Sequence, residues 1–181
     1  MSNPLVIGKD LGDITLPVPA SAYVAATAGG SGDNTAVTGL TIDRFTLQPT
    51  GASTAVSNEP PTSALFELYY ECALGAANTI TIKSAKLEDS ADGTNWATVF
   101  DSTASPSTAP STWPASGVVD TGGTGGTTQR GVVAFNTNIK QCRRYVRFDW
   151  TPDLSAANTD TGKFTVTAVL SGFAEVPPGV V

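Results

Sequence analysis

The chain has 181 residues and a mass of 18.5 kDa, a size that suits one domain with or without tails. Apolar residues make up 40% of it and charged residues 14%, which favours a globular fold over a solvated, disordered chain. It contains no histidine, which excludes Ser-His and Cys-His nucleophile pairs and His-ligated metal sites. We therefore expect a non-enzymatic protein with no cofactor and no metal.

Charge and hydropathy exclude two classes of partner. The net charge is -6 and the isoelectric point is near 4.4, so the chain repels the phosphates of nucleic acids and anionic lipids, which bind clustered Lys and Arg. No apolar stretch approaches the roughly 20 residues that span a bilayer, and the first ten residues lack the pattern of a secretion signal. We expect no nucleic-acid partner and no membrane partner.

The first 35 residues differ in composition from the rest of the chain. They are rich in alanine and glycine, carry Pro17 and Pro19, and contain only short apolar runs. One such run, Leu5-Val6-Ile7, is too apolar for a free tail, so another surface is expected to cover it. We predict an extended arm over residues 1–35 that packs along the body or along a neighbouring subunit. Leu5, Val6 and Ile7 are candidate partner-binding residues.

Alternating apolar residues predict a series of β-strands after the arm. Threonine occurs 26 times beside 18 glycines and 12 prolines, a mixture that favours strands and turns over helices. The clearest strand spans 64–74, and the other expected strands span 37–47, 79–87, 96–100, 131–136, 143–150 and 163–173, with at least one more near the N-terminus. A one-residue slip in the apolar pattern predicts a β-bulge near Ser84. The dipeptide Asp92-Gly93 predicts a hairpin turn.

This number of short strands predicts an antiparallel β-sandwich or jelly roll, with a barrel as the alternative. The sandwich domain is expected over residues 36–175, followed by a C-terminal tail over 176–181. The predicted core consists of large apolar residues on the alternating positions of these strands, namely Phe66, Leu68, Ile80, Ile82, Trp96, Val146, Phe148, Phe164 and Val166.

The segment from 101 to 130 is a long connection rich in proline, serine, threonine and glycine. Connections of this length inside a compact domain are usually functional or disordered. Trp113 lies within it and supports two interpretations. An exposed tryptophan suits a partner contact, because aromatic residues dominate interface hot spots. Alternatively, Trp113 folds back and caps one end of the core.

An acidic row lies on the clearest strand. Glu67, Tyr69 and Glu71 are expected to share the face opposite the apolar residues of 64–74. By the rise of a strand, the two glutamates lie about 13 Å apart, too far to flank a glycosidic bond. We therefore expect a solvated sheet face rather than a glycosidase site.

A basic strip lies on the strand at 143–150. Arg143, Tyr145 and Arg147 are expected on one face and Val146 and Phe148 on the other. Such a strip combines charge, stacking and hydrogen bonding, which suits a protein-binding surface. The alternative, which we favour slightly, is internal pairing with the acidic row on 64–74, because opposite charges on neighbouring strands attract.

Two stretches carry a resemblance to known families. Leu87 to Trp96 contains D-S-x-D-G-x-x-W after a strand, and Arg143 to Phe148 contains R-Y-V-R. Together they resemble a pairing found in structural proteins of tailed-phage virions. They are also similar to part of the discoidin-type domain, a jelly roll that displays binding loops at one end. The phage resemblance implies a capsid decoration or cement protein, or another accessory subunit of the head or tail, and such subunits often trimerise.

We therefore expect a virion structural protein that binds and stabilises the assembled particle. The expected partners are the major capsid protein or other virion proteins, together with further copies of the chain in a homo-oligomer, with a trimer favoured. The expected location is the virion, after synthesis in the cytoplasm of a bacterial host. The alternative is a discoidin-like or carbohydrate-binding module that recognises a cell-surface glycan.

Overall fold

The computed structural model describes residues 15–46, 60–104, 110, 113, 117–155 and 159–172, and these residues form strands, turns and bends without a helix. The all-β fold class is thus confirmed. The strands are β1 (Thr15–Pro19), β2 (Val24–Thr27), β3 (Ile42–Asp43), β4 (Ser63–Leu74), β5 (Thr79–Ser90), β6 (Trp96–Asp101), β7 (Val118–Thr121), β8 (Thr127–Asn138), β9 (Tyr145–Leu154) and β10 (Thr161–Ser171).

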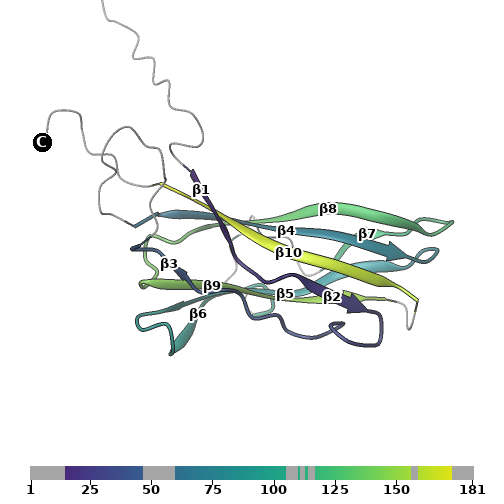
Figure 1. Ribbon diagram of the computed structural model, residues 1–181, viewed down its shortest axis with the longest axis horizontal. Helices are drawn as coiled ribbons and strands as arrows, with labels where there is room; N and C mark the ends of the chain where they lie inside the picture. Colours follow the sequence, from purple (N-terminus) through teal and green to yellow (C-terminus); the bar gives the residue numbers. More distant parts are fainter. Residues whose placement is uncertain are drawn as a thin grey trace, which may run out of the picture.

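The strands form two antiparallel sheets that pack face to face (Figure 1). Sheet A has the order β1-β10-β4-β8, with β2 pairing with β10 beside β1. Sheet B has the order β3-β9-β5-β6, with β7 pairing with β5 beside β6. β1 and β2 pair with opposite ends of β10, and β6 and β7 with opposite ends of β5. Each of these two pairs therefore occupies a single border position of its sheet.

The topology is that of a jelly roll. The described residues form ten strands. When each of the two divided borders is counted once, these strands fill eight positions in chain order. Numbered in chain order, sheet A reads 1-8-3-6 and sheet B reads 2-7-4-5. Two sheets of four positions joined in this way make the double-sheet roll with eight strands.

The core lies between the two sheets, and aromatic rings connect them. Phe66 of β4 stacks on Phe148 of β9 with ring centroids 4.8 Å apart. Phe135 of β8 packs against the same Phe148 ring at 5.0 Å. The predicted bulge is confirmed, since the β5–β9 register shifts between Ile82 and Ser84. All of the predicted core residues except Trp96 are buried.

Trp96 is the exception because the β5–β6 hairpin changes register. The pairing shifts between Leu87 and Glu88, and Trp96 then lies opposite Ser90. This places the indole on the outer face of sheet B, where it is half-buried and the Arg147 guanidinium lies 4.2 Å from its ring centroid. The expectation that Trp96 belongs to the core is therefore wrong.

The predicted strand at 37–47 is mostly irregular. Among its described residues, 37–46, only Ile42–Asp43 forms a strand, with one further bridge between Val37 and Trp150. Gly39 lies so close to the Phe148 backbone that a side chain would not fit there. The segment still follows the border of β9 and hydrogen-bonds to it at several points, but without a regular ladder.

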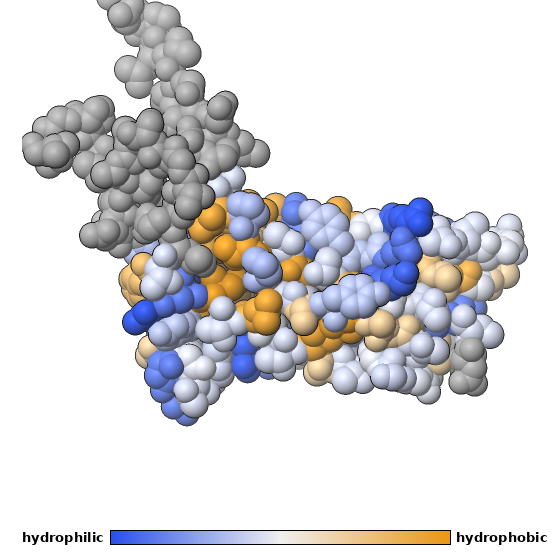
Figure 2. Space-filling model, viewed as in Figure 1, coloured by the Kyte–Doolittle hydropathy of each residue, from blue (hydrophilic) through white to orange (hydrophobic). Residues whose placement is uncertain are grey.

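Residues 15–35 pack along the body of the same chain, through β1 and β2 on β10. The face shown in Figure 2 has apolar surface gathered around β1 and the adjoining part of sheet A. Leu16 and Val18 contribute to the edge of the core there. The candidate residues Leu5, Val6 and Ile7 and the expected tail at 176–181 lie outside the described residues.

Truncating the aromatic contact between the sheets should destabilise the fold strongly. We expect Phe66→Ala or Phe148→Ala to lower the free energy of unfolding by about 3–5 kcal/mol, because each leaves a cavity between the sheets. Urea titration followed by circular dichroism measures this loss. The control Val118→Ala removes an exposed side chain and should change stability by no more than about 0.5 kcal/mol. Equal effects of the core and control variants would contradict the assignment.

Candidate functional site

The two stretches that carry the resemblance lie side by side in the structure. In the β5–β9 ladder, Glu88 is opposite Arg147 and Ser90 is opposite Tyr145. Folding therefore joins the D-S-x-D-G-x-x-W turn and the R-Y-V-R strand into one surface at the hairpin end of sheet B. We call its charged members the β5–β9 ion cluster, which comprises Lys86, Glu88, Asp89, Arg143 and Arg147.

The outward half of the cluster centres on Glu88. Its carboxylate accepts hydrogen bonds from Arg147 Nε at 2.8 Å and Nη2 at 2.5 Å, and it pairs with Lys86 Nζ at 2.7 Å. The Glu88 side chain is only 8% exposed. Burial by itself raises the pKa of Glu88, but the bonds from Lys86 and Arg147 outweigh it and hold the pKa below its usual value. The Arg147 guanidinium also stacks over Trp96.

The inward half of the cluster is a clamp around Asp89. Arg143 donates to Asp89 Oδ1 through Nε at 2.8 Å and Nη2 at 2.6 Å, and its backbone N–H donates to Oδ2 at 2.8 Å. The Asp89 backbone carbonyl accepts a further bond from Arg143 Nη2 at 3.1 Å. Both carboxylate oxygens are thus occupied, and the start of β9 is fixed to the end of β5.

A buried arginine that sequence reasoning missed lies next to this clamp. Arg44 is 1% exposed, and its guanidinium donates to the backbone carbonyls of Cys142, Arg143 and Pro61. Burial lowers its pKa from the usual value. Arg44 therefore holds three segments together: the end of β3, the chain before β4 and the chain before β9. A lone arginine after an irregular segment carries no sequence signal for this role.

The turn between β5 and β6 is held together internally. The Asp92 carboxylate accepts the backbone N–H groups of Thr94 and Asn95, each at 2.8 Å. These backbone bonds, followed by those from side chains, depress the pKa of Asp92. Gly93 adopts a φ of 74°, which suits glycine. Within the described ranges, no group of three or more His, Cys, Asp or Glu side chains could hold a metal ion.

The candidate residues of the basic strip have internal partners. Arg143 and Arg147 belong to the β5–β9 ion cluster, and Tyr145 lies beneath the guanidinium of Arg144, 4.9 Å from its ring centroid. Arg144 in turn pairs with Asp43 at 2.6 Å. The structure thus gives Arg143, Arg144 and Arg147 each a separate carboxylate partner within the same chain.

The acidic row does not supply the partners of this strip, and that expectation is wrong. Glu71 pairs instead with Arg130 at 2.7 Å and Lys163 at 3.6 Å, while the Tyr69 hydroxyl donates to Glu67 at 2.7 Å. β4 belongs to sheet A and β9 to sheet B. The outward faces of the two strands therefore point away from each other, whatever their charge.

Trp113 adopts the core-capping position. It is 6% exposed, and its ring makes edge contacts with Phe100, Phe135 and Phe148. Its indole N–H donates to the Asn136 carbonyl at 2.8 Å. The tryptophan thus attaches the β6–β7 connection to the core and to β8, and its ring is not displayed for a partner.

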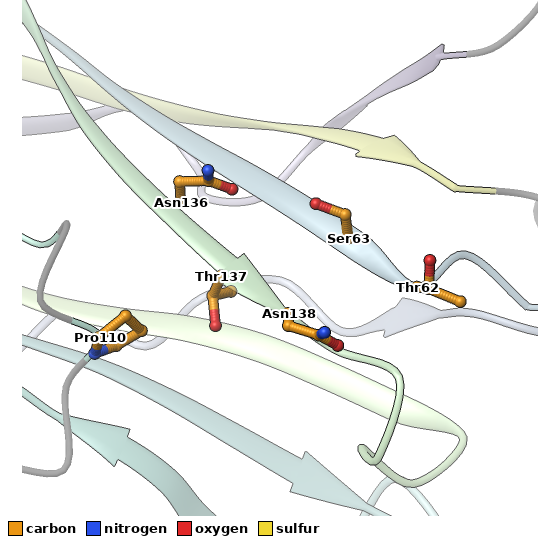
Figure 3. A pocket seen from close by; sticks show the side chains of 6 residues that line it. All are labelled: Thr62, Ser63, Pro110, Asn136, Thr137 and Asn138. Atoms are coloured by element: carbon orange, nitrogen blue, oxygen red, sulfur yellow. The ribbon is translucent and has the colours of Figure 1, made fainter.

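Polar hollows lie on the surface formed by the described residues. One, of about 300 Å³, is lined by hydroxyl and amide side chains and a proline, namely Thr62, Ser63, Pro110, Asn136, Thr137 and Asn138 (Figure 3). Another, of about 200 Å³, lies over sheet B and includes Lys86, Asp101 and Asp149. Hydroxyl and amide groups can hydrogen-bond a polar ligand, but the lining of the first hollow contains no titratable group.

Comparison with known proteins identifies no family for the chain. No protein-family model matches the chain, and none of the curated proteins matches it. Among solved structures, the chain is similar to a chain in "Structure of infectious bursal disease virus Gx strain", with 10% sequence identity and a TM-score of 0.40. The match covers 92% of this chain and 34% of that one, so the present chain spans about a third of its length. A similarity with this identity and TM-score carries no information on function.

Acid should destabilise the folded chain. The pKa values of Asp43, Glu71, Glu88 and Asp92 lie below their usual values. Their contribution to stability is therefore complete above the unfolded pKa values of 3.8 and 4.5, and is lost as the pH falls through the folded values. Burial raises the pKa of Asp149, which opposes this trend for one group. We expect the free energy of unfolding from urea titrations to fall between pH 5 and pH 3, about the range of these titrations.

Glu88→Gln and Glu71→Gln form a matched pair for this prediction. Glu88 is nearly buried, whereas the Glu71 side chain is 40% exposed. We expect both variants to reduce the slope of stability against pH. High salt should remove the effect of Glu71→Gln and retain most of that of Glu88→Gln, because screening acts mainly on exposed pairs. An unchanged slope in Glu88→Gln would contradict the role given to the cluster.

Proposed function

We propose that the protein is a non-enzymatic structural subunit of a tailed-phage virion, of the decoration or cement type. The observation that carries this proposal is the jelly-roll topology of sheets A and B. Viral capsid domains and lectins are among the proteins built on this double-sheet roll. Because one fold serves many functions, the choice between these classes rests on the surface and on the resemblance of the β5–β6 turn and the start of β9.

The use of charge in the structure supports a structural role. Arg143 and Arg147 are engaged by Asp89 and Glu88, so their charges serve the packing of β5 against β9. The chain has no histidine to act as a general base near neutral pH. A roll whose nearly buried carboxylates are paired with arginines of the same chain suits a subunit that reinforces a particle.

The N-terminal segment offers a means of attachment. Residues 1–14 precede β1, which lies at the border of sheet A. The apolar run Leu5-Val6-Ile7 in this segment is proposed to bind a neighbouring copy or the major capsid protein. If each copy binds the next through this run, identical subunits close into a symmetric ring. We favour a trimer that forms on the virion.

A glycan-binding module is the second candidate. Two observations favour it: Tyr23 and Tyr69 are exposed at 63% and 43%, and the hollow in Figure 3 presents hydroxyl and amide groups. Exposed aromatic rings and such polar groups are the usual means of binding a sugar. This candidate would act as an isolated chain, whereas a cement protein requires the assembled shell.

Particle binding separates the two candidates. We expect the purified chain to bind assembled particles of its virus to saturation and to ignore unassembled capsid subunits, because the binding surface exists only on the lattice. Cosedimentation followed by mass spectrometry measures occupancy, and a glycan array serves as the opposing test. Specific glycan binding without particle binding would establish the second candidate.

Removal of residues 1–14 tests the attachment segment. The deletion stops before Thr15 because β1 belongs to sheet A. We expect weaker self-association or lower occupancy on particles while the far-UV circular dichroism spectrum remains that of the roll. Replacing Leu5, Val6 and Ile7 by serine in the full chain should have the same effect. Unchanged oligomeric mass together with unchanged occupancy would rule out this role.

A further inference from the structure

The strand β8 forms one border of sheet A, opposite β1 and β2 (Figure 1). It pairs with β4 along all of its 12 residues, from Thr127 to Asn138. The backbone groups that do not face β4 therefore point out of the sheet. Such groups are a template for another strand unless something covers them.

The Trp113 hydrogen bond identifies which residues of β8 point outward. The Asn136 carbonyl accepts the indole N–H of Trp113, which comes from outside the sheet. Because successive residues of a strand alternate in direction, the backbone groups of Arg130, Val132 and Ala134 also point outward. Within the described residues, no hydrogen bond to these outward groups is found.

Both flanks of this stretch are covered by the same chain. On one side, the Gln129 side chain donates to the Thr121 carbonyl at 2.9 Å and so ties β8 to the end of β7. On the other side, Trp113 occupies the Asn136 carbonyl. Among the described residues, the stretch left uncovered is therefore 130–134, with the sequence Arg-Gly-Val-Val-Ala.

The opposite border of sheet A is protected. The Ala20 N–H donates to the Val166 carbonyl, so Ala20, like Val18 and Leu16 before it, faces β10. The intervening residues Pro17 and Pro19 face outward, and proline has no N–H to offer a new strand. The border at β1 is thus closed to strand addition, whereas no described residue closes the stretch 130–134 of β8.

We propose that residues 130–134 of β8 pair with the same residues of a second copy across a two-fold axis. In antiparallel pairing centred on Val132, each outward residue meets another outward residue. Val132 faces Val132 of the second copy, and Arg130 faces Ala134 of the second copy. Three such pairs exchange about six backbone hydrogen bonds. The edge is thereby complementary to itself, as a two-fold interface requires.

The side chains suit this register. Val132 is 51% exposed and lies opposite Tyr69 on the outer face of sheet A. Pairing would place Tyr69, Val132, Val132 and Tyr69 in one row and cover part of their apolar surface. Arg130 is the one charged residue of the stretch, and it is held by Glu71 at 2.7 Å. The antiparallel register separates the two Arg130 side chains, so like charges do not meet.

This interface belongs to the isolated chain and does not depend on the proposed virion role. Disulfide trapping tests its register. In a Cys142→Ser background, Val132→Cys should form a covalent dimer under mild oxidation, because directly opposed residues have Cα atoms about 5.5 Å apart. Arg130→Cys and Ala134→Cys should each remain uncrosslinked alone and should crosslink when mixed. The matched control, Val118→Cys, places a thiol at the 63% exposed Val118 of β7 and should not dimerise.

A second measurement tests the same edge without introducing a thiol. In sedimentation equilibrium, Val132→Lys should halve the mass of the assembly, because two lysines would meet at the axis. Val118→Lys should leave the mass unchanged. The proposal is overturned if the chain is monomeric at about 100 µM, if Val132→Lys has no effect, or if Arg130→Cys alone crosslinks as well as the mixture. It stands if the mixed pair crosslinks selectively and Val132→Lys halves the mass.

Discussion

The contact between Phe66 and Phe148 is the constraint on which the other parts of the molecule depend. These rings stack across the space between the two sheets. Phe148 also contacts Phe135 and Trp113, so one side chain joins β9 to β4, to β8 and to the β6–β7 connection. The position of Trp113 then determines which part of the β8 edge is covered, through its bond to Asn136. Core packing thus limits where a partner can add to the sheet.

The β5–β9 ion cluster shows why consecutive charges tolerate partial burial. Glu88 and Asp89 are neighbours on β5, so their side chains point to opposite faces of sheet B. Each carboxylate meets its own arginine, Glu88 meeting Arg147 of β9 on the outer face and Asp89 meeting Arg143 from the chain just before β9. Removing one arginine would leave a carboxylate in a poorly hydrated place, which costs more than the pair contributes. The same arrangement keeps two adjacent acids from repelling each other strongly.

The strands with strict alternation could be predicted from the sequence, because each buries one face and exposes the other. The bulge near Ser84 was also predictable, since a bulge shifts the apolar pattern by one residue. The side of the sheet on which Trp96 lies could not be predicted, because it depends on a register shift between β5 and β6 that the sequence does not indicate. The partners of the arginines depended on which sheet holds each strand, and Arg44 depends on three carbonyls from distant segments. Long-range topology decides such contacts.

The three tryptophans report on three different parts of the roll. Trp150 packs against Phe164 in the interior, Trp113 lies on the β6–β7 connection, and Trp96 lies beneath Arg147 at the surface. Their indole fluorescence therefore distinguishes loosening of the core, release of the connection and opening of the ion cluster. Single-tryptophan variants would turn these positions into separate optical probes, so that partial opening of the molecule can be followed one region at a time.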